Sequence, residues 1–245
     1  MKRSVLIFLI FFCSGNLFSQ WQQQVSNTGN SLNSVHFINS NTGWACGFET
    51  VLKTTDCGNT WNSAYLSGYH KSIFFTDENN GWICGENGKI FKTTNGGINW
   101  ILMNSGVNSR LNQIAFSDQY TGLIAGSNNK ILKTTDAGNS WNNVNIFNSL
   151  IEIDFYSVKI LNATNYIVTG TESTVYTTTN SGLTWDSVSF GMPNPLLTVE
   201  FINMNTGWVS GCCGMFMKTS DGGKIWSPEV YLTPGYSVNS MKFIN

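Results

Sequence analysis

The segment Thr54-Thr55-Asp56-Cys57-Gly58-Asn59-Thr60-Trp61 occurs in five related copies along the chain. Each copy has an Asp or Asn, a glycine two residues later and a closing tryptophan, and the tryptophans are 39, 41, 44 and 41 residues apart. A fixed period of this length is typical of proteins built from repeated structural units. The defining positions of the five boxes are Asp56, Gly58 and Trp61; Asn95, Gly97 and Trp100; Asp136, Gly138 and Trp141; Asn180, Gly182 and Trp185; and Asp221, Gly223 and Trp226.

The chemistry of these boxes favours a structural role. Asp and Asn side chains accept hydrogen bonds from backbone amides in turns, and glycine adopts a positive φ without steric cost. The tryptophan would then cover the hairpin that the turn closes. Because Asp and Asn alternate at the first position, the sequence indicates a turn former there and argues against a general acid or a metal ligand.

Each box belongs to a longer unit. Apolar runs of four to seven residues alternate with clusters of Gly, Asn, Asp and Ser, as at residues 34–39, 43–47, 51–55 and 61–66 of the first unit. This pattern predicts four short antiparallel strands joined by tight turns. Four strands recurring every 40–45 residues are typical of a β-propeller blade. We predict an all-β β-propeller of four-stranded blades, with complete repeats at about 32–67, 70–106, 111–147, 155–190 and 196–232.

Partial repeats flank the five units. Residues 21–26 resemble a box tryptophan followed by a fourth strand, and residues 238–245 match the first strand of the first unit at 32–39. We expect partial strands at both places and a parent propeller of six or seven blades. A five-bladed ring with a spare strand at its seam is the alternative.

The first twenty residues have the features of an export signal. Lys2 and Arg3 precede the apolar run 5–12, and a short polar stretch ends near Gln20. A basic segment, an apolar segment of about 7–15 residues and a small residue before the cut describe a secretory signal peptide. The run is shorter than the roughly 20 apolar residues of a membrane anchor. We therefore expect a cleaved signal at 1–20 and a secreted, periplasmic or extracellular propeller at 21–245 with no integral membrane segment.

Composition excludes several functions. Only 11% of the 245 residues are charged and the formal net charge is −1, whereas a nucleic-acid-binding protein normally carries a basic face. The chain has two histidines and no zinc-ligand spacing, so we expect no metal, no cofactor and no nucleic-acid partner. The adjacent Cys212 and Cys213 could form a disulfide in an oxidising compartment, with free thiols as the equal alternative.

The turns of such a unit divide between two faces of the ring. The boxes and the turns between first and second strands share one face, which we call the box face. The turns between second and third strands and the loops between units share the other, which we call the loop face. Its longer, aromatic segments suit a protein or carbohydrate surface, although the same aromatics could instead fill the seams between blades. The candidate binding residues are Tyr69, His70, Lys71, Arg110, Phe155, Tyr156 and Tyr236.

Hydrolytic activity is the main competing function. A glycosidase needs two carboxylates about 5–10 Å apart, for which Glu152, Asp154 and Glu200 are candidates. A sialidase needs an arginine cluster, and Arg110 is the one arginine after the signal. We predict a non-enzymatic protein. The alternatives are an Asp-box glycoside hydrolase and a passive propeller segment of a larger secreted surface protein.

The boxes resemble BNR or Asp-box repeats. The whole unit, with its Gly-Trp-x-x-Gly second strand and Lys-Thr-Thr-Asp-x-Gly-x-Thr-Trp box, is similar to the photosystem II assembly and stability factor family of β-propellers. The resemblance implies a non-enzymatic scaffold in photosynthesis that holds an assembly intermediate through a basic, arginine-bearing patch, to which Arg110 and Lys71 would correspond. We therefore expect an exported scaffold that binds a protein or glycan surface, and the sequence leaves its oligomeric state open.

Overall fold

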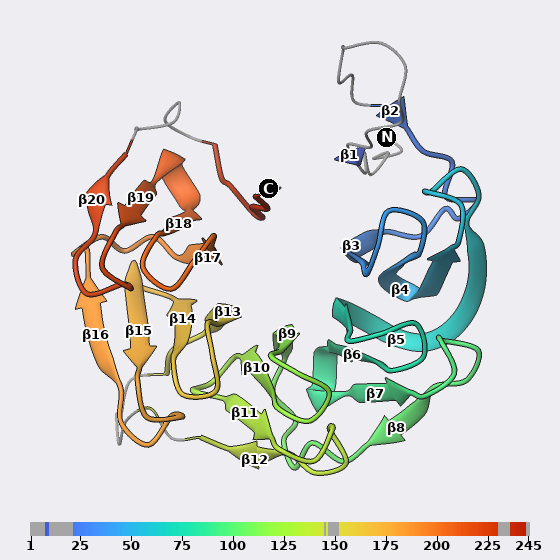
Figure 1. Ribbon diagram of the computed structural model, residues 1–245, viewed down its shortest axis with the longest axis horizontal. Coiled ribbons are helices and arrows are strands. Elements are labelled where there is room, and N and C mark those ends of the chain that lie inside the picture. Colours follow the sequence, from blue (N-terminus) through green and yellow to red (C-terminus); the bar gives the residue numbers. More distant parts are fainter. Residues whose placement is uncertain (1–7, 10–21, 145, 147–151, 230–235, 244–245) are drawn as a thin grey trace.

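The chain folds as the predicted all-β propeller. The structure is a computed structural model that describes residues 8–9, 22–144, 146, 152–229 and 236–243. Its strands form antiparallel sheets that follow one another around an open arc (Figure 1). Three sheets have four strands each, in the orders β12-β11-β10-β9, β13-β14-β15-β16 and β17-β18-β19-β20, and a fourth has six strands in the order β3 to β8.

The bounds of the elements follow the period of the sequence. The six-stranded sheet contains β3 (Leu32–Phe37), β4 (Gly43–Thr54), β5 (Asn62–Phe75), β6 (Gly81–Gly85), β7 (Ile90–Thr93) and β8 (Ile101–Met103). The next two sheets contain β9 (Leu111–Phe116), β10 (Gly122–Gly126), β11 (Ile131–Thr134), β12 (Asn142–Asn143), β13 (Phe155–Ile160), β14 (Tyr166–Gly170), β15 (Thr174–Thr178) and β16 (Asp186–Ser189). The last contains β17 (Leu196–Phe201), β18 (Gly207–Gly211), β19 (Phe216–Thr219) and β20 (Ser227–Pro228), and the 3-10 turns are η1 (Glu86–Gly88) and η2 (Cys212–Gly214).

The six-stranded sheet consists of two consecutive units. The first part of β4 pairs with β3, its second part pairs with β5, and the chain turns between them at Glu49, whose φ is 50°. Strand β5 pairs with β4 through residues 62–69 and with β6 through residues 70–75. It therefore serves as the last strand of the first unit and the first strand of the second, and the described residues contain five four-stranded units in succession.

A ladder of hydrogen bonds joins the inner strands of neighbouring units. The first strand of each unit lies on the inside of the arc (Figure 1). A side-chain oxygen on that strand accepts the backbone N–H of the first strand of the following unit, so an edge that would otherwise be unpaired is satisfied. The four contacts are Ile73 N–H to Ser34 Oγ (3.3 Å), Ile114 N–H to Ser72 Oγ (3.3 Å), Val158 N–H to Gln113 Oε1 (2.6 Å) and Val199 N–H to Ser157 Oγ (3.1 Å).

Tryptophans in the second strands bridge the units at their seams. Trp44 stacks on Phe75 of the next unit with 3.6 Å between ring centroids, and its Nε1 donates to Gly96 O in the box of that unit at 3.0 Å. Trp82 repeats this arrangement one unit later. It stacks on Phe116 at 3.9 Å and donates to Ala137 O at 3.1 Å. Each of these tryptophans therefore ties the core of one unit to the turn of the next.

The hydrogen bonding of a box tryptophan depends on whether a tryptophan of the preceding unit donates to the same box. In the fourth and fifth boxes the closing tryptophan donates to its own turn, from Trp185 Nε1 to Gly182 O (3.2 Å) and from Trp226 Nε1 to Gly223 O (2.9 Å). In the second and third boxes the neighbouring tryptophan occupies the turn. There Trp100 Nε1 and Trp141 Nε1 are buried without a hydrogen-bond partner among the described residues.

The box itself is closed by its own Asp or Asn. In the third copy, Asp136 Oδ1 accepts the Ser140 N–H at 2.9 Å and Oδ2 accepts the Ser140 hydroxyl at 2.6 Å. Hydrogen bonds from the Ser140 side chain and backbone hold the pKa of Asp136 at about 2. Asn180 accepts the equivalent amide of Thr184 at 2.9 Å. Because its own turn occupies this oxygen, the position accommodates either Asp or Asn.

The two ends of the chain are described in part. Of the predicted signal at residues 1–20, the structure describes only β1 (Phe8–Leu9), which pairs with β2 (Gln22–Gln23). Trp21 lies outside the described residues. The expected strand at 238–245 is not formed over residues 238–243, and residues 244–245 lie outside the described part. A strand requires a ladder partner. Phe243 nevertheless contacts the fifth unit, because its ring centroid lies 4.4 Å from that of Trp208, with the two rings tilted by 38°. Among the described residues no helix is long and apolar enough to cross a membrane.

Substitution of Gly138 by Ala tests the contact between neighbouring units. A Cβ at Gly138 (φ 75°) would lie 2.5 Å from Trp82 Nε1, whereas a Cβ at Gly106 (φ 71°) would meet no atom within 4 Å. Both substitutions carry the cost of a positive φ, about 1–2 kcal/mol, but only Gly138→Ala adds overpacking of about 1–3 kcal/mol. We expect Gly138→Ala to lower the free energy of unfolding, measured with urea, by more than Gly106→Ala does. Equal losses would show that Trp82 does not constrain the box.

Candidate functional site

In four of the five units, the turn of the loop face is held to the body of its unit by a backbone hydrogen bond. The residue after the second strand donates its backbone N–H to the carbonyl just before the first strand of the same unit. This occurs from Phe48 to Ser31 (2.9 Å), from Ser127 to Arg110 (2.8 Å), from Thr171 to Asp154 (3.0 Å) and from Cys212 to Pro195 (3.2 Å). The loop face therefore presents its side chains from turns of fixed backbone, which lowers the entropy lost when a partner binds.

Three aromatic side chains of the first unit are exposed on this face, and two of them are in contact. Phe48 is 42% exposed, Tyr65 72% and Tyr69 36%. Phe48 is paired with Tyr69 across β4 and β5, with 5.9 Å between the ring centroids, and Thr50 is paired with Tyr65. We call Phe48, Tyr65 and Tyr69 the aromatic patch.

Charged groups at the rim of the aromatic patch compensate each other. Lys71 Nζ lies 4.5 Å from the centroid of the Tyr69 ring and 3.6 Å from Glu86 Oε1. Lys89 Nζ donates to Ser67 O at 3.3 Å, and Tyr65 Oη donates to Glu49 Oε1 at 3.5 Å. The patch is therefore apolar at its centre and nearly neutral at its rim. A cation above an aromatic ring also restrains that ring.

Two of the predicted binding residues lie in the core and not on the surface. His70 is 1% exposed, its Nε2 lies 2.9 Å from Leu66 O, and its ring meets Phe91 edge-on at 5.6 Å. Burial lowers the pKa of His70, so the imidazole is neutral at pH 7. Phe155 is 1% exposed and meets Tyr176 edge-on at 5.4 Å. Both residues belong to inner strands, where the alternating pattern of the strand turns them into a seam.

Arg110 and Tyr156 lie in a second group on the loop face. Arg110 Nη2 is 3.5 Å from Asp154 Oδ2, and the other carboxylate oxygen accepts the Asn128 N–H at 3.1 Å. Burial raises the pKa of Tyr156, and the nearby Asp154 and Cys212 raise it further while Arg110 opposes them. The arginine that the family resemblance would assign to a basic patch is thus paired with a carboxylate.

The predicted residues therefore fall into separate places. Tyr69 and Lys71 lie together, and Arg110 and Tyr156 lie together. Tyr236 is 71% exposed beside the fifth unit, where its carbonyl accepts the Gly214 N–H at 2.8 Å.

Phe48 was not among the binding residues predicted from the sequence. A signal for it exists, because an aromatic residue at 48 follows Gly47 in a turn where the other units carry Glu86, Ser127, Thr171 and Cys212.

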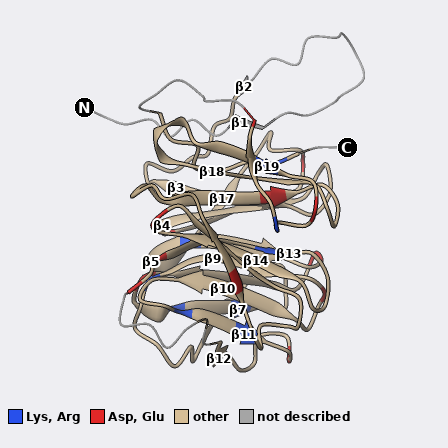
Figure 2. Cartoon of the chain, turned by 90° about the vertical axis from the view of Figure 1, so that its left-hand side faces the viewer, with Lys and Arg blue, Asp and Glu red and all other residues tan. Residues whose placement is uncertain are grey.

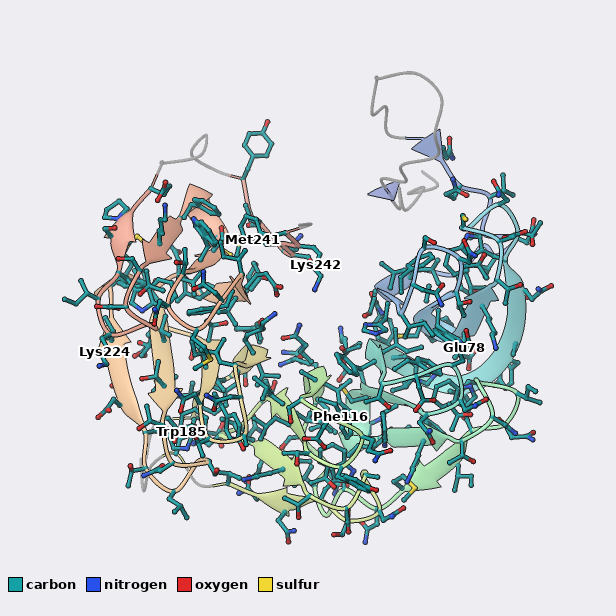
Figure 3. All side chains as sticks on the ribbon, in the orientation of Figure 1. Glu78, Phe116, Trp185, Lys224, Met241 and Lys242 are labelled. Carbon is teal, nitrogen blue, oxygen red and sulfur yellow. The ribbon has the colours of Figure 1, made fainter. Side chains whose placement is uncertain are left out.

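A hollow of about 530 Å³ lies at the inner end of the box face. It is lined by His36, Phe74, Phe116, Asp77 and Asp118 among others, and Figure 3 shows Phe116 at the inside of the arc. The oxygen Oδ1 of each carboxylate accepts two N–H groups of its own turn, at 2.7 to 2.9 Å. For Asp77, burial raises the pKa, but hydrogen bonds from Asn80 and Asn79 outweigh it and the pKa is lowered. Both residues thus act as turn formers.

No group of three or more His, Cys, Asp and Glu side chains that could hold a metal ion occurs in the described part of the chain. Charged residues are also sparse. Figure 2 shows Lys, Arg, Asp and Glu as scattered points along a chain that is mostly uncharged.

Comparison with known proteins supports the fold and the repeat family. A family model described as photosynthesis system II assembly factor YCF48 matches residues 69–189. No curated protein matches the sequence. Among solved structures, YCF48 from Cyanidioschyzon merolae is similar, with 19% identity, a TM-score of 0.67, and coverage of 86% of this chain and 75% of that one.

Two further structures extend this comparison. A YCF48 bound to D1 peptide has 18% identity and a TM-score of 0.55, with 82% of each chain covered. The GH74 enzyme of Niastella koreensis has 19% identity and a TM-score of 0.71, with 86% of this chain and 41% of that one covered. At these identities the structural likeness establishes the β-propeller fold.

Replacing His36 by Phe tests the inner surface of the arc. Phe74 occupies the equivalent position in the second unit, and the two rings lie 4.5 Å apart. Burial lowers the pKa of His36 to about 4 from 6.5, opposed by the hydrogen bond with Phe75 O and assisted by Lys242. Since protonation is easier in the unfolded chain, the stability that neutral His36 contributes is present above pH 6.5 and is lost as the pH falls through 4.

We expect the urea midpoint of the unsubstituted protein to fall between pH 7 and pH 4, and that of His36→Phe to fall less. The buried His70 contributes a fall of the same sign in both proteins and serves as the internal reference. Identical pH profiles for the two proteins would contradict the burial of His36.

Proposed function

We propose that this β-propeller, which is similar to photosystem II assembly factor YCF48 over residues 69–189, is a non-enzymatic scaffold that binds a segment of another protein through the aromatic patch. One observation carries the proposal. Phe48 and Tyr69 are exposed and paired across β4 and β5, and Tyr65 is exposed further along β5. Aromatic side chains are enriched at protein interfaces and supply much of their binding energy.

The chemistry of the patch defines the kind of partner. Lys71 and Lys89 are balanced by Glu49 and Glu86 at its rim, so net charge supplies little attraction. The partner segment should therefore carry apolar or aromatic anchors, with hydrogen-bonding groups that reach the tyrosine hydroxyls. The structure of a YCF48 bound to D1 peptide is a precedent in a similar fold for a peptide as ligand, and it favours a protein partner over a glycan.

Glycoside hydrolysis, the activity of the GH74 neighbours, is the competing function. Of the three candidate carboxylates, Asp154 lies 3.5 Å from Arg110, and Glu200 lies 2.8 Å from Lys159 and 3.5 Å from Lys242. A catalytic pair needs one carboxyl group as a proton donor at working pH. Both of these carboxylates are instead held in ion pairs with cationic side chains of the same chain.

Alanine substitutions in the patch test the proposal. A peptide selected from a displayed random library on the unsubstituted protein would be labelled, and its affinity measured by fluorescence anisotropy. We expect Phe48→Ala and Tyr69→Ala each to weaken binding by roughly tenfold or more. Tyr120→Ala is the matched control, because Tyr120 is 55% exposed on the opposite, box face, and its substitution should leave binding unchanged.

Two outcomes would overturn the scaffold function. One is binding that Tyr120→Ala weakens as much as the patch variants do. The other is release of reducing ends from xyloglucan that is abolished by Asp154→Asn or Glu200→Gln. Either result would move the functional site away from the aromatic patch.

The proposal includes export of the protein. Residues 1–20 carry a basic start followed by a short apolar run, the pattern of a cleaved secretory signal. A reporter fused after residue 25 should be exported and lose about 20 residues, as measured by intact mass. Replacing Leu6 and Leu9 by Arg should hold the reporter inside the cell. Export that persists in this variant would contradict the signal.

A further inference from the structure

A cavity rich in sulfur lies on the loop face beside the fifth unit. It has a volume of about 250 Å³, and five of its seven lining residues are Met192, Cys212, Cys213, Met215 and Met217. Phe190 and Asn194 complete the lining. The cavity therefore brings two thiols and three thioethers together, and it is separate from the aromatic patch of the first unit.

The backbone around the two cysteines is held from several sides. The Cys212 N–H donates to Pro195 O at 3.2 Å, and the Gly214 N–H donates to Tyr236 O at 2.8 Å. Within the turn, the Met215 N–H donates to Cys212 O at 3.4 Å. The thiols are thus presented by a turn whose shape does not depend on their side chains.

The equivalent turn of the second unit shows that the fold does not require sulfur here. Turns η1 and η2 share one backbone, since Asn87 has φ 57° and ψ 34° and Cys213 has φ 62° and ψ 29°. In η1 the positions of Cys212, Cys213 and Met215 are held by Glu86, Asn87 and Lys89. Left-handed backbone favours Asn over Cys. The backbone conformation of η2 therefore does not explain why this turn carries sulfur-containing residues where η1 carries Glu86, Asn87 and Lys89.

We propose that this cavity binds Cu(I), with Cys212 and Cys213 as thiolate ligands and a methionine thioether completing the site. Thiolates and thioethers are soft ligands that select Cu(I), whereas hard cations require oxygen ligands. Met192 reaches the cavity from the loop between the fourth and fifth units and is 41% exposed, so it lies where an ion would enter. Met215 is 6% exposed and lies on the inner side.

The binding step is balanced in protons and involves no electron transfer. Each cysteine that binds the ion loses its thiol proton to solvent and forms one S–Cu bond, and Cu(I) remains Cu(I). Because protons are released, the affinity should rise with pH.

Competition with bicinchoninate tests the site. The full chain, reduced and kept free of oxygen, would be titrated into the coloured Cu(I)–bicinchoninate complex. We expect one equivalent of Cu(I) to be withdrawn per chain. The double variant Cys212→Ser/Cys213→Ser should withdraw none. Met192→Leu, Met215→Leu and Met217→Leu keep side-chain size, and at least one of these three variants should reduce the affinity by at least about tenfold.

The matched control is Cys57→Ser, because Cys57 is a partly exposed thiol in the first box and should not contribute. Circular dichroism of each variant would establish that the propeller is folded. X-ray absorption at the copper edge should show sulfur as the only ligand atom. An unchanged colour with the unsubstituted protein, copper retained by the double variant, or a shell of nitrogen and oxygen would each overturn the proposal.

Discussion

The structure depends on one constraint, which is that a four-stranded sheet of this size cannot bury both of its faces or satisfy its inner edge alone. Each unit therefore needs its neighbour. Trp44 and Trp82 meet this need by stacking on a phenylalanine of the next unit and donating to the carbonyl of its box. Side-chain oxygens such as Ser34 Oγ accept the N–H groups of the next inner strand. A hydrogen bond of this kind recurs at each of the four seams between the described units.

The same constraint explains the low charge of the chain. Both faces of an inner sheet lie against protein, so few positions remain where Lys or Glu is favoured. Two lysines donate hydrogen bonds across the seams between neighbouring units. Lys92 Nζ donates to Asn139 Oδ1 in the following box at 2.8 Å, and Lys133 Nζ donates to Ser181 O at 3.0 Å. Charged side chains on the inner surface also form ion pairs. Glu200 Oε1 lies 2.8 Å from Lys159 Nζ and 3.5 Å from Lys242 Nζ. Figure 3 shows Lys242 at the opening of the arc.

The repeat made the fold predictable and left the site only partly so. The spacing of the box tryptophans predicts four-stranded units because every unit solves the same packing problem. The binding residues break the repeat, and their surroundings depend on contacts across strands that a single sequence does not show. His70 and Tyr69 are adjacent in sequence, yet one lies in a seam and the other on the surface, because successive residues of a strand face opposite ways. Phe48 becomes part of a patch only through its pairing with Tyr69 in β5.

The box face and the loop face of the arc differ in how polar side chains are used. On the box face, polar side chains are used to close turns, as Asp136, Asp77 and Asp118 do. On the loop face, a backbone hydrogen bond to the residue before the first strand holds the turn in four of the units, and the side chains of these turns vary between units. The aromatic patch of the first unit and the sulfur-lined cavity beside the fifth both arise from this variation.

Hydrogen–deuterium exchange of the chain with and without a bound partner peptide would test the central claim most directly. A propeller that binds through the aromatic patch should gain protection at the turn 47–50 and at residues 64–71, with the five boxes unchanged. Protection that appears instead at the boxes or along the turns 76–80 and 117–121 would place the partner on the box face and contradict the account.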